Sequence, residues 1–277
     1  MTDNVVAFGR HGQRGYFAAA DIPQSPSVRD IAFGTGWWEL DQIFKFYPGQ
    51  FVVMSGIAGH GKSSLMLNIL MRVARQHGIK SFLYGPENEK HIRERIRGIW
   101  GEQDGIDYFL ENQLFLQSSS PEYYGAERHT LDWVLDKARF AIEKDKIELV
   151  VIDPWNELEY AKPRDVSMTD HIGQSLMLVK EFVRFFNCVV MIIAHPTKAV
   201  FDRGSSRVPG LADIEGSMNW YNKCDNGLII WRDLGRNSCK VISAKVREIG
   251  AGKTGECYFA VDPATGIFTP QHGAVTP

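Results

Sequence analysis

The residues best suited to chemistry form a glycine-rich stretch, GIAGHGKSS, at positions 56–64. Gly56, Gly61, Lys62 and Ser63 fall on the fixed positions of the pattern GxxxxGK[ST]. Glycines allow backbone N–H groups to wrap around phosphate oxygens, and a helix that begins at the lysine adds the partial positive charge of its N-terminus. The stretch therefore predicts a phosphate-binding loop.

The side chains of this loop suit a nucleoside triphosphate and a metal ion. Lys62 would reach the β- and γ-phosphates, and Ser63 would bind Mg²⁺. A glycine-rich turn that matches by chance is the alternative, but a strand before the stretch and a helix after it favour the phosphate site. The residues predicted to bind the nucleotide are Gly56, Gly59, His60, Gly61, Lys62, Ser63 and Ser64.

Three further polar residues follow apolar runs that are typical of buried strands. Asp153 ends LVVID, Glu87 follows FLYGP and His195 follows MIIA. Because the carboxyl ends of parallel strands open on one crevice, we expect these side chains near the phosphates. Asp153 is predicted to bind Mg²⁺ with Ser63, Glu87 to orient or deprotonate the attacking water, and His195 to contact the γ-phosphate.

Each of these assignments has an alternative. An aspartate that ends a strand is often a turn residue. Glu89 competes with Glu87, although an acidic residue in a first helical turn is explained by the helix dipole. His195 could also be a histidine that is buried for packing.

Short apolar runs and amphipathic stretches alternate along the chain. This alternation predicts an α/β fold with a mostly parallel, twisted sheet and helices on both faces. After residue 226, three strands joined by short turns predict an antiparallel C-terminal edge. The strands are expected at 50–55, 80–84, 114–117, 148–153 and 188–194, and the helices at 62–77, 88–100, 131–142 and 170–186.

Composition and periodicity limit the organisation of the chain. Residues 1–30 are predicted to be an N-terminal arm or linker, and residues 31–277 one domain. The net charge is −2, so any nucleic-acid binding must rely on local patches. The four cysteines form no CxxC pair, which favours a reduced compartment over a zinc site. The longest aliphatic run, at 188–194, is too short to span a membrane, so a cytoplasmic protein is expected.

Lys245 and Arg247 stand out within the strand-like run VISAKVREIG. Side chains two residues apart on a strand share a face, so these two cations lie together. They are either solvated surface charges or partners of a strongly negative group.

Taken in order, these segments resemble the motifs of the RecA-like ring helicases of superfamily 4, which include DnaB, Twinkle and the phage primase-helicases. The likeness is greatest to the phage and Twinkle-like branch. By this resemblance, Glu87 matches the catalytic glutamate and His195 the phosphate sensor. The segments that carry it are GTGWWELD, GIAGHGKSS, YGPENE, VVIDPWNEL, AHPTK, DIEGSMNWYNKCDNGLIIWRD and KVRE.

The resemblance also implies an assembly. In that family the K-x-R pair, here Lys245 and Arg247, projects into the nucleotide site of the neighbouring subunit. An arginine supplied in trans is worth roughly 10³–10⁵ in rate. A homo-oligomer is therefore expected, in the form of a hexameric ring.

A loop rich in Gly, Ser and Pro lies between AHPTK and GSMNW. By resemblance it lines the central channel, where its cations and backbone N–H groups hold single-stranded DNA without reading its sequence. A solvated surface loop is the alternative. The residues predicted to bind nucleic acid are Lys198, Arg203, Arg207, Gly216 and Ser217.

The resemblance predicts a replicative DNA helicase that uses ATP, or another NTP, with Mg²⁺ to move along single-stranded DNA. Only about thirty residues precede the core, so we expect either a trimmed part of a longer protein or a stand-alone helicase. In the second case a separate primase, polymerase or loader is an expected partner, in a bacterial or phage-infected cell. Two other classes remain open: a recombination ATPase of the RecA or RadA type, and a regulatory ATPase similar to KaiC. Steep salt dependence of DNA binding would argue against the regulatory class.

Overall fold

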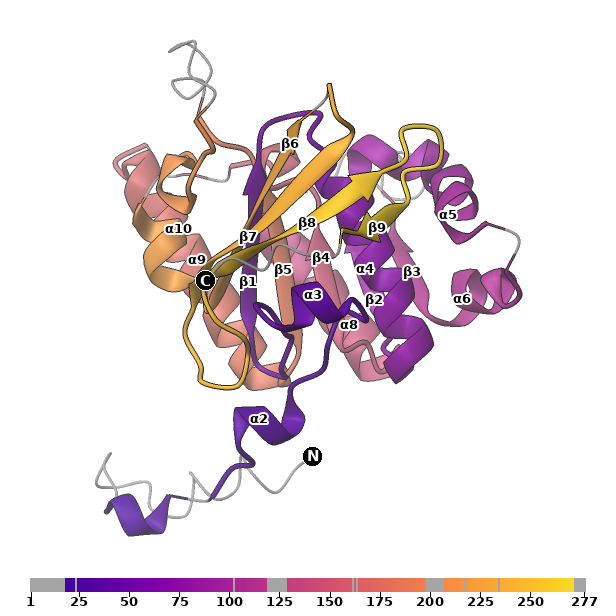
Figure 1. Cartoon of the computed structure of the whole chain (residues 1–277). Helices are drawn as coiled ribbons and strands as arrows, with labels where there is room; N and C mark the ends of the chain where they lie inside the picture. Colours follow the sequence, from indigo (N-terminus) through magenta and orange to yellow (C-terminus); the bar gives the residue numbers. More distant parts are fainter. Residues whose placement is uncertain are drawn as a thin grey trace.

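The apolar runs form one nine-stranded sheet, with the strand order β3-β2-β4-β5-β1-β6-β7-β8-β9 (Figure 1). The structure is a computed structural model, and it describes residues 18–22, 24–101, 103–118, 129–160, 162, 164–197, 207–216, 218–233 and 235–271, without the side chains at 87, 88 and 90. The parallel strands are β1 (Phe51–Gly56), β2 (Ser81–Tyr84), β3 (Leu114–Gln117), β4 (Leu149–Ile152), β5 (Val189–Ala194) and β6 (Asn226–Asp233).

The C-terminal edge of the sheet is antiparallel, as the sequence predicts. It consists of β7 (Ser238–Val246), β8 (Gly255–Val261) and β9 (Phe268–Pro270), which extend the sheet outward from β6. β9 cannot be predicted from the sequence, because three residues are too few for a pattern of period two to show. The fold class predicted from the sequence is otherwise confirmed.

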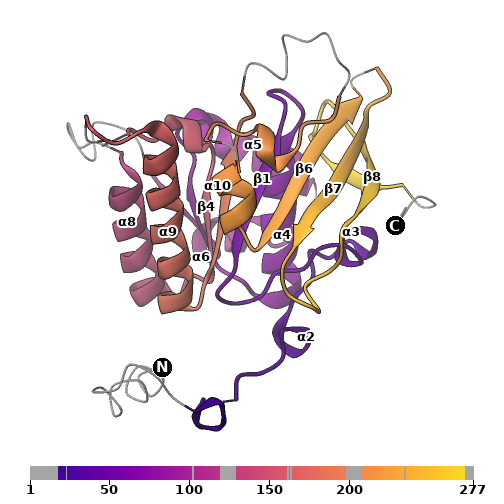
Figure 2. The ribbon, with the colours of Figure 1, turned by 90° about the vertical axis from the view of Figure 1, so that its left-hand side faces the viewer.

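Helices cover both faces of the sheet (Figure 2). Side chains alternate along each strand, so Val52 and Met54 of β1 join one core cluster while Phe51 and Val53 join the other. The first cluster lies beneath α3 (Trp38–Asp41), α4 (Lys62–His77), α5 (Ile92–Trp100) and α6 (Ile106–Asn112). The second lies beneath α8 (Leu131–Asp145), α9 (Met168–Phe186) and α10 (Met218–Lys223).

The starts of the long helices differ in one respect that matters for binding. Thr130 caps α8 by accepting a hydrogen bond from the backbone N–H of Trp133, and Ser167 caps α9 in the same way from Asp170. The N-cap of α4 is Gly61, which has no side chain to offer. The first turn of α4 is therefore left without a side-chain cap, as an anion site requires.

Short elements connect these units. They are η1 (Ala19–Asp21), α2 (Val28–Ile31), η2 (Pro86–His91), η3 (Trp155–Glu157) and η5 (Leu211–Asp213). The predicted helix at 88–100 begins as the 3₁₀ turn η2 and continues as α5. The division of the chain at residue 30 stays a prediction. No helix in the described ranges is long and apolar enough to cross a membrane, and all four cysteines are free and buried.

Candidate active site

The carboxyl ends of β4, β5 and β1 are neighbours in the sheet, and they bring the predicted phosphate loop, Asp153 and His195 together. The loop depends on glycine. A Cβ at Gly56 would come within 2.2 Å of the carbonyl oxygen of Ile230, and Gly59 and Gly61 have φ values of +78° and +88°. A side chain at these positions would clash or be strained, so the backbone of this loop requires glycine.

Lys62 lies at this loop with its side chain almost fully buried, at 5% exposure. Its ammonium donates hydrogen bonds to the carbonyl oxygens of Gly56 (2.9 Å) and Ile57 (3.0 Å). Neutral carbonyls are weaker partners for an ammonium than phosphate oxyanions. The ammonium is therefore held at the loop by contacts that a phosphate could replace.

Asp153 follows β4 and is also buried, at 3% exposure. Burial raises the pKa of its carboxyl, while a hydrogen bond with Ser63 and the charges of Lys62 and Arg95 lower it in part. Its Oδ2 atom is buried and has no hydrogen-bond partner among the described residues. A buried carboxylate oxygen without a partner, beside a serine hydroxyl, is an oxygen donor set that fits Mg²⁺.

His195 follows β5 and faces the same site. Its backbone N–H donates to Asn156 Oδ1 at 3.1 Å, and its buried Nδ1 has no partner among the described residues. Burial, and next the charge of Lys62, lowers the pKa of His195 to about 4. The imidazole is therefore neutral near pH 7 and has a ring nitrogen available to a phosphate or a water.

Two loop residues connect the site to other elements. His60 Nδ1 accepts a hydrogen bond of 2.9 Å from the backbone N–H of Arg232 on β6. Ser64 Oγ accepts one of 3.1 Å from Arg95 Nη2 on α5. Arg95 is not among the residues predicted for the site, because one arginine in a charged helix forms no pattern. Its charge nevertheless acts on Asp153.

Glu87 lies in η2, directly after β2, and β2 pairs with β4 beside Asp153. Its side chain is outside the described part of the structure. The rival residue, Glu89, lies in the same 3₁₀ turn, and its Oε1 accepts a hydrogen bond from Ser118. The choice of Glu87 as the catalytic base stays a prediction.

The K-x-R pair lies at the other end of the sheet. Val246 of β7 is opposite Asn226 of β6, which is opposite Val52 of β1, whereas Gly56 of the phosphate loop is opposite Ile230. The four residue-to-residue steps from Val52 to Gly56 span roughly 13 Å of strand. The strand register therefore separates Lys245 and Arg247 from the phosphate loop of their own chain.

Within the chain, the K-x-R pair binds oxygen atoms near the end of α10. Lys245 Nζ donates to the carbonyl oxygens of Tyr221 and, at 3.3 Å, Asn222. Arg247 Nη2 donates to the carbonyl oxygens of Asn222 (2.9 Å) and Cys224 (3.2 Å). Arg247 Nε pairs with Asp225 Oδ1 at 3.1 Å. Asp225 is thus an anionic partner of Arg247 that was not predicted from the sequence.

The predicted nucleic-acid residues are only partly described. Lys198, Arg203 and Ser217 fall outside the described residues. Arg207 is exposed and pairs with Asp213 at 2.5 Å. Gly216 has a φ of +77°, and a Cβ there would lie 2.4 Å from Ile172 Cδ1. Close packing against α9 is therefore sufficient to account for a glycine at this position. A role of Gly216 in DNA binding stays a prediction.

Comparisons with known proteins agree with this architecture. The chain is 30% identical over 272 residues to a Twinkle homolog protein of Arabidopsis thaliana, and the alignment covers 90% of the chain and 37% of the relative. It is 23% identical over 227 residues to the replicative DNA helicase DnaB of Mycoplasma genitalium, with 72% of the chain and 46% of the relative covered. The chain thus spans less than half the length of either relative.

Solved structures show the same fold. A DnaB-like replicative helicase, solved in a study of its interactions with primase, aligns with a TM-score of 0.73 at 19% identity, over 98% of this chain and 67% of the other. No protein-family profile matches the chain. The resemblance to the RecA-like domain of superfamily 4 helicases, predicted from the motifs, is confirmed.

Proposed function

We propose that this chain, a RecA-like domain of the superfamily 4 helicase type, hydrolyses ATP or another NTP and acts as the motor of a replicative DNA helicase. The observation that carries the proposal is a group of polar atoms without hydrogen-bond partners at the carboxyl end of the sheet. They lie near the N-terminus of α4, which has no side-chain cap. Asp153 Oδ2 and His195 Nδ1 are both buried there without a partner among the described residues. A bound nucleotide with its metal ion would satisfy both.

The residues of this site have separate tasks. The N–H groups that begin α4 and the ammonium of Lys62 bind the phosphates. Ser63 and Asp153 would hold Mg²⁺, which would supply positive charge to neutralise the phosphates. Glu87 orients the attacking water, and the neutral imidazole of His195 contacts the γ-phosphate. Glu87 follows β2 and His195 follows β5, so the two residues lie on opposite sides of Asp153, which follows β4.

The site is completed by a second copy of the chain. Lys245 and Arg247 lie at the opposite end of the sheet from their own phosphate loop, so a neighbouring subunit is the partner whose γ-phosphate they would contact. A head-to-tail contact of this kind closes into a ring when the rotation between subunits permits it. We infer a homo-oligomer, with six subunits as the expected ring.

The loop between β5 and α10 is the proposed DNA contact. It begins directly after His195, at the end of the sheet that holds the nucleotide. Lys198, Arg203 and Arg207 would neutralise DNA phosphates, and the N–H groups of Gly216 and Ser217 would assist. The exposed pair between Arg207 and Asp213 is of a kind that contributes little stability, so Arg207 is available to DNA at little cost.

The partners outside the chain are proposed from its relatives. The DnaB-like structure was solved in a study of interactions with primase. We infer that this chain also works with a primase or a loader, in the compartment where DNA is replicated.

The test is NTP hydrolysis measured with and without single-stranded DNA over a series of protein concentrations. A DNA-driven motor with shared sites should show strong stimulation by DNA and a turnover per subunit that rises cooperatively with concentration. Turnover that is indifferent to both would overturn the proposal in favour of a regulatory ATPase. Filaments with strand-pairing activity would identify a recombination ATPase instead.

A further inference from the structure

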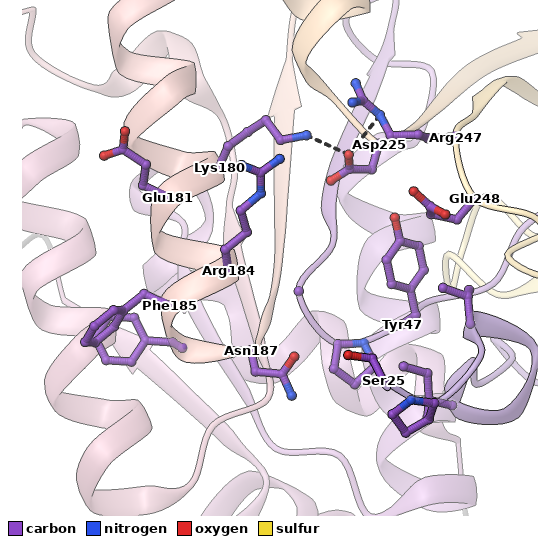
Figure 3. A pocket seen from close by; sticks show the side chains of 16 residues that line it. Ser25, Tyr47, Lys180, Glu181, Arg184, Phe185, Asn187, Asp225, Arg247 and Glu248 are labelled. Carbon is purple, nitrogen blue, oxygen red and sulfur yellow. Dashed lines mark hydrogen bonds and ion pairs between the residues drawn. The ribbon is translucent and has the colours of Figure 1, made fainter. Parts of the chain in front are cut away.

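A buried ion network surrounds Arg247. Asp225 Oδ1 lies 2.7 Å from Lys180 Nζ and 3.1 Å from Arg247 Nε (Figure 3). Asp225 Oδ2 accepts a hydrogen bond of 2.9 Å from the backbone N–H of Phe51. The side chains of Lys180 and Asp225 are only 8% and 7% exposed. One buried carboxylate thus binds two cations that come from α9 and from the end of β7.

We propose that Asp225 is the positioning residue of Arg247: it orients the guanidinium so that the free edge is presented to the γ-phosphate of the neighbouring subunit. This inference rests on the proposed role of Arg247 in trans. It adds a residue that makes no contact with nucleotide itself and acts only through Arg247.

The contacts of Arg247 define which edge is presented. The ion pair uses Nε, and both hydrogen bonds to the end of α10 use Nη2, while Nη1 takes part in none of the contacts among the described residues. A guanidinium is planar, so fixing two of its nitrogens fixes the third. The side chain is 39% exposed, so Nη1 is accessible to a phosphate oxygen without loss of the contacts within the chain.

Lys180 explains why the charge of Arg247 is not cancelled. A carboxylate paired with Arg247 alone would form a neutral pair, which would attract a phosphate weakly. Here Asp225 carries one negative charge against the two positive charges of Lys180 and Arg247, so the trio keeps one positive charge. Lys245 adds another at the same helix end. Orientation and surplus charge together make a preorganised site for an anion.

The groove beside this network has a volume of about 1080 Å³ and also contains Glu248 and Glu181. Neither of these acids takes part in an ion pair among the described residues. In Figure 3 the carboxylate of Glu248 lies beside the Tyr47 hydroxyl, while Asp225 is the carboxylate joined to Arg247. Glu248→Gln is therefore a matched control for loss of negative charge next to Arg247.

The decisive experiment mixes subunits. Asp225→Asn is expected to lower kcat for DNA-stimulated hydrolysis by roughly tenfold or more. KM for ATP should change by less than about twofold, because the nucleotide is still bound and only the transition state loses a contact. Glu248→Gln should retain wild-type kcat. Lys62→Ala subunits lack a working phosphate loop but present an intact Arg247.

Mixing Asp225→Asn with Lys62→Ala subunits before assembly should restore hydrolysis above the sum of the two parents. In a random one-to-one mixture about a quarter of the sites pair an intact loop with an intact Arg247. A kcat of Asp225→Asn equal to wild type, or a mixture without gain, would overturn the positioning role. If Asp225→Asn does not fold, Asp225→Glu carries the same test, because it keeps the charge and displaces the guanidinium.

A parallel mixture of Arg247→Ala with Lys62→Ala separates this inference from the proposed function. Recovery in that mixture supports the trans role without involving Asp225. No recovery there means that the trans role itself is wrong. Recovery there without recovery for Asp225→Asn means that only the positioning role is wrong.

Discussion

The two ends of the central sheet differ in how their buried ionisable side chains are paired. At the carboxyl end, Asp153 Oδ2 and His195 Nδ1 are buried without partners among the described residues. At the amino end, Lys180, Arg247 and Asp225 satisfy one another. The site at the carboxyl end is therefore incomplete within the described chain, whereas the charges of the network at the amino end are paired.

The difference shows what each end is built to do. Leaving a buried polar atom unsatisfied costs about 1–3 kcal/mol, so the carboxyl end weakens the fold until a ligand binds. Ligand binding should raise the free energy of unfolding again, because a ligand that binds only the folded state stabilises it. At the amino end the ion pairs offset the cost of burying these charges. A neighbouring phosphate would there contact a guanidinium that is already oriented.

The largest expected effect comes from removing the cation at the incomplete end. Lys62→Ala should lower hydrolysis by roughly a thousandfold, because the β- and γ-phosphates lose their direct positive partner. Added ATP and Mg²⁺ should then no longer raise the melting temperature. Lys144→Ala, on the exposed face of α8, is the control and should behave as wild type. Normal turnover by Lys62→Ala would show that the carboxyl end of the sheet does not bind the phosphates through Lys62.

Replacing Asp153 should separate function from stability. Because burial raises the pKa of this carboxyl, its charged form weakens the fold near neutral pH when no metal is bound. Asp153→Asn should therefore lower Mg²⁺-dependent turnover by roughly a hundredfold and raise the free energy of unfolding without Mg²⁺ by about 1 kcal/mol. Urea unfolding and hydrolysis assays measure the two quantities. A loss of stability in the variant would mean that the carboxylate is already satisfied within the chain.

The loop after β5 should respond to salt. If Arg203 and Arg207 each neutralise one phosphate of single-stranded DNA, replacing both by alanine should reduce the slope of log K against log salt by about 1.4 in magnitude per subunit bound. Fluorescence anisotropy at several salt concentrations gives this slope. Arg236→Ala, in the exposed turn between β6 and β7, is the matched control. An unchanged slope in the double variant would remove the loop from the DNA surface.

The positions of the residues at the carboxyl end could be predicted from the sequence for a physical reason. Glycine, lysine and serine at fixed spacing leave little freedom for another structure, and an acidic residue after an apolar run marks the end of a strand. Gly56, Lys62, Ser63, Asp153 and His195 therefore lie where the pattern places them. All of them are local to single strand ends, so the topology of a parallel sheet is enough to bring them together.

The amino end could not be predicted in the same way. Asp225 precedes β6, Lys180 lies in the middle of α9, and Arg247 follows β7, so their contact depends on the order of the strands and the rotation of one helix. No spacing in the sequence encodes that contact. In the sequence, Lys180 comes after apolar residues of a predicted helix. Nothing there distinguishes it from a lysine that is exposed to solvent. The sequence left open whether Lys245 and Arg247 are solvated or paired with an anion, and it did not indicate Asp225 as the partner within the chain.

The smallest expected effect concerns pH at the incomplete end. Because burial and Lys62 lower the pKa of His195 from 6.5 to about 4, the unfolded chain binds a proton at this residue within that window and the folded chain does not. Stability should therefore fall as the pH falls from 6.5 toward 4. His195→Asn should remove part of this dependence, up to about 1 kcal/mol between pH 7 and pH 5 once solvent screening is allowed for.

Urea unfolding of wild type and variant at pH 7, 6 and 5 measures this effect, with His91→Asn as the control for an exposed histidine. Saturating nucleotide should reduce the difference if a phosphate oxygen accepts a hydrogen bond from the imidazole, because that contact favours a protonated ring. Equal pH dependence in wild type and His195→Asn would show that this imidazole finds a partner in the folded chain. His195 would then belong, like Arg247, to the satisfied part of the molecule.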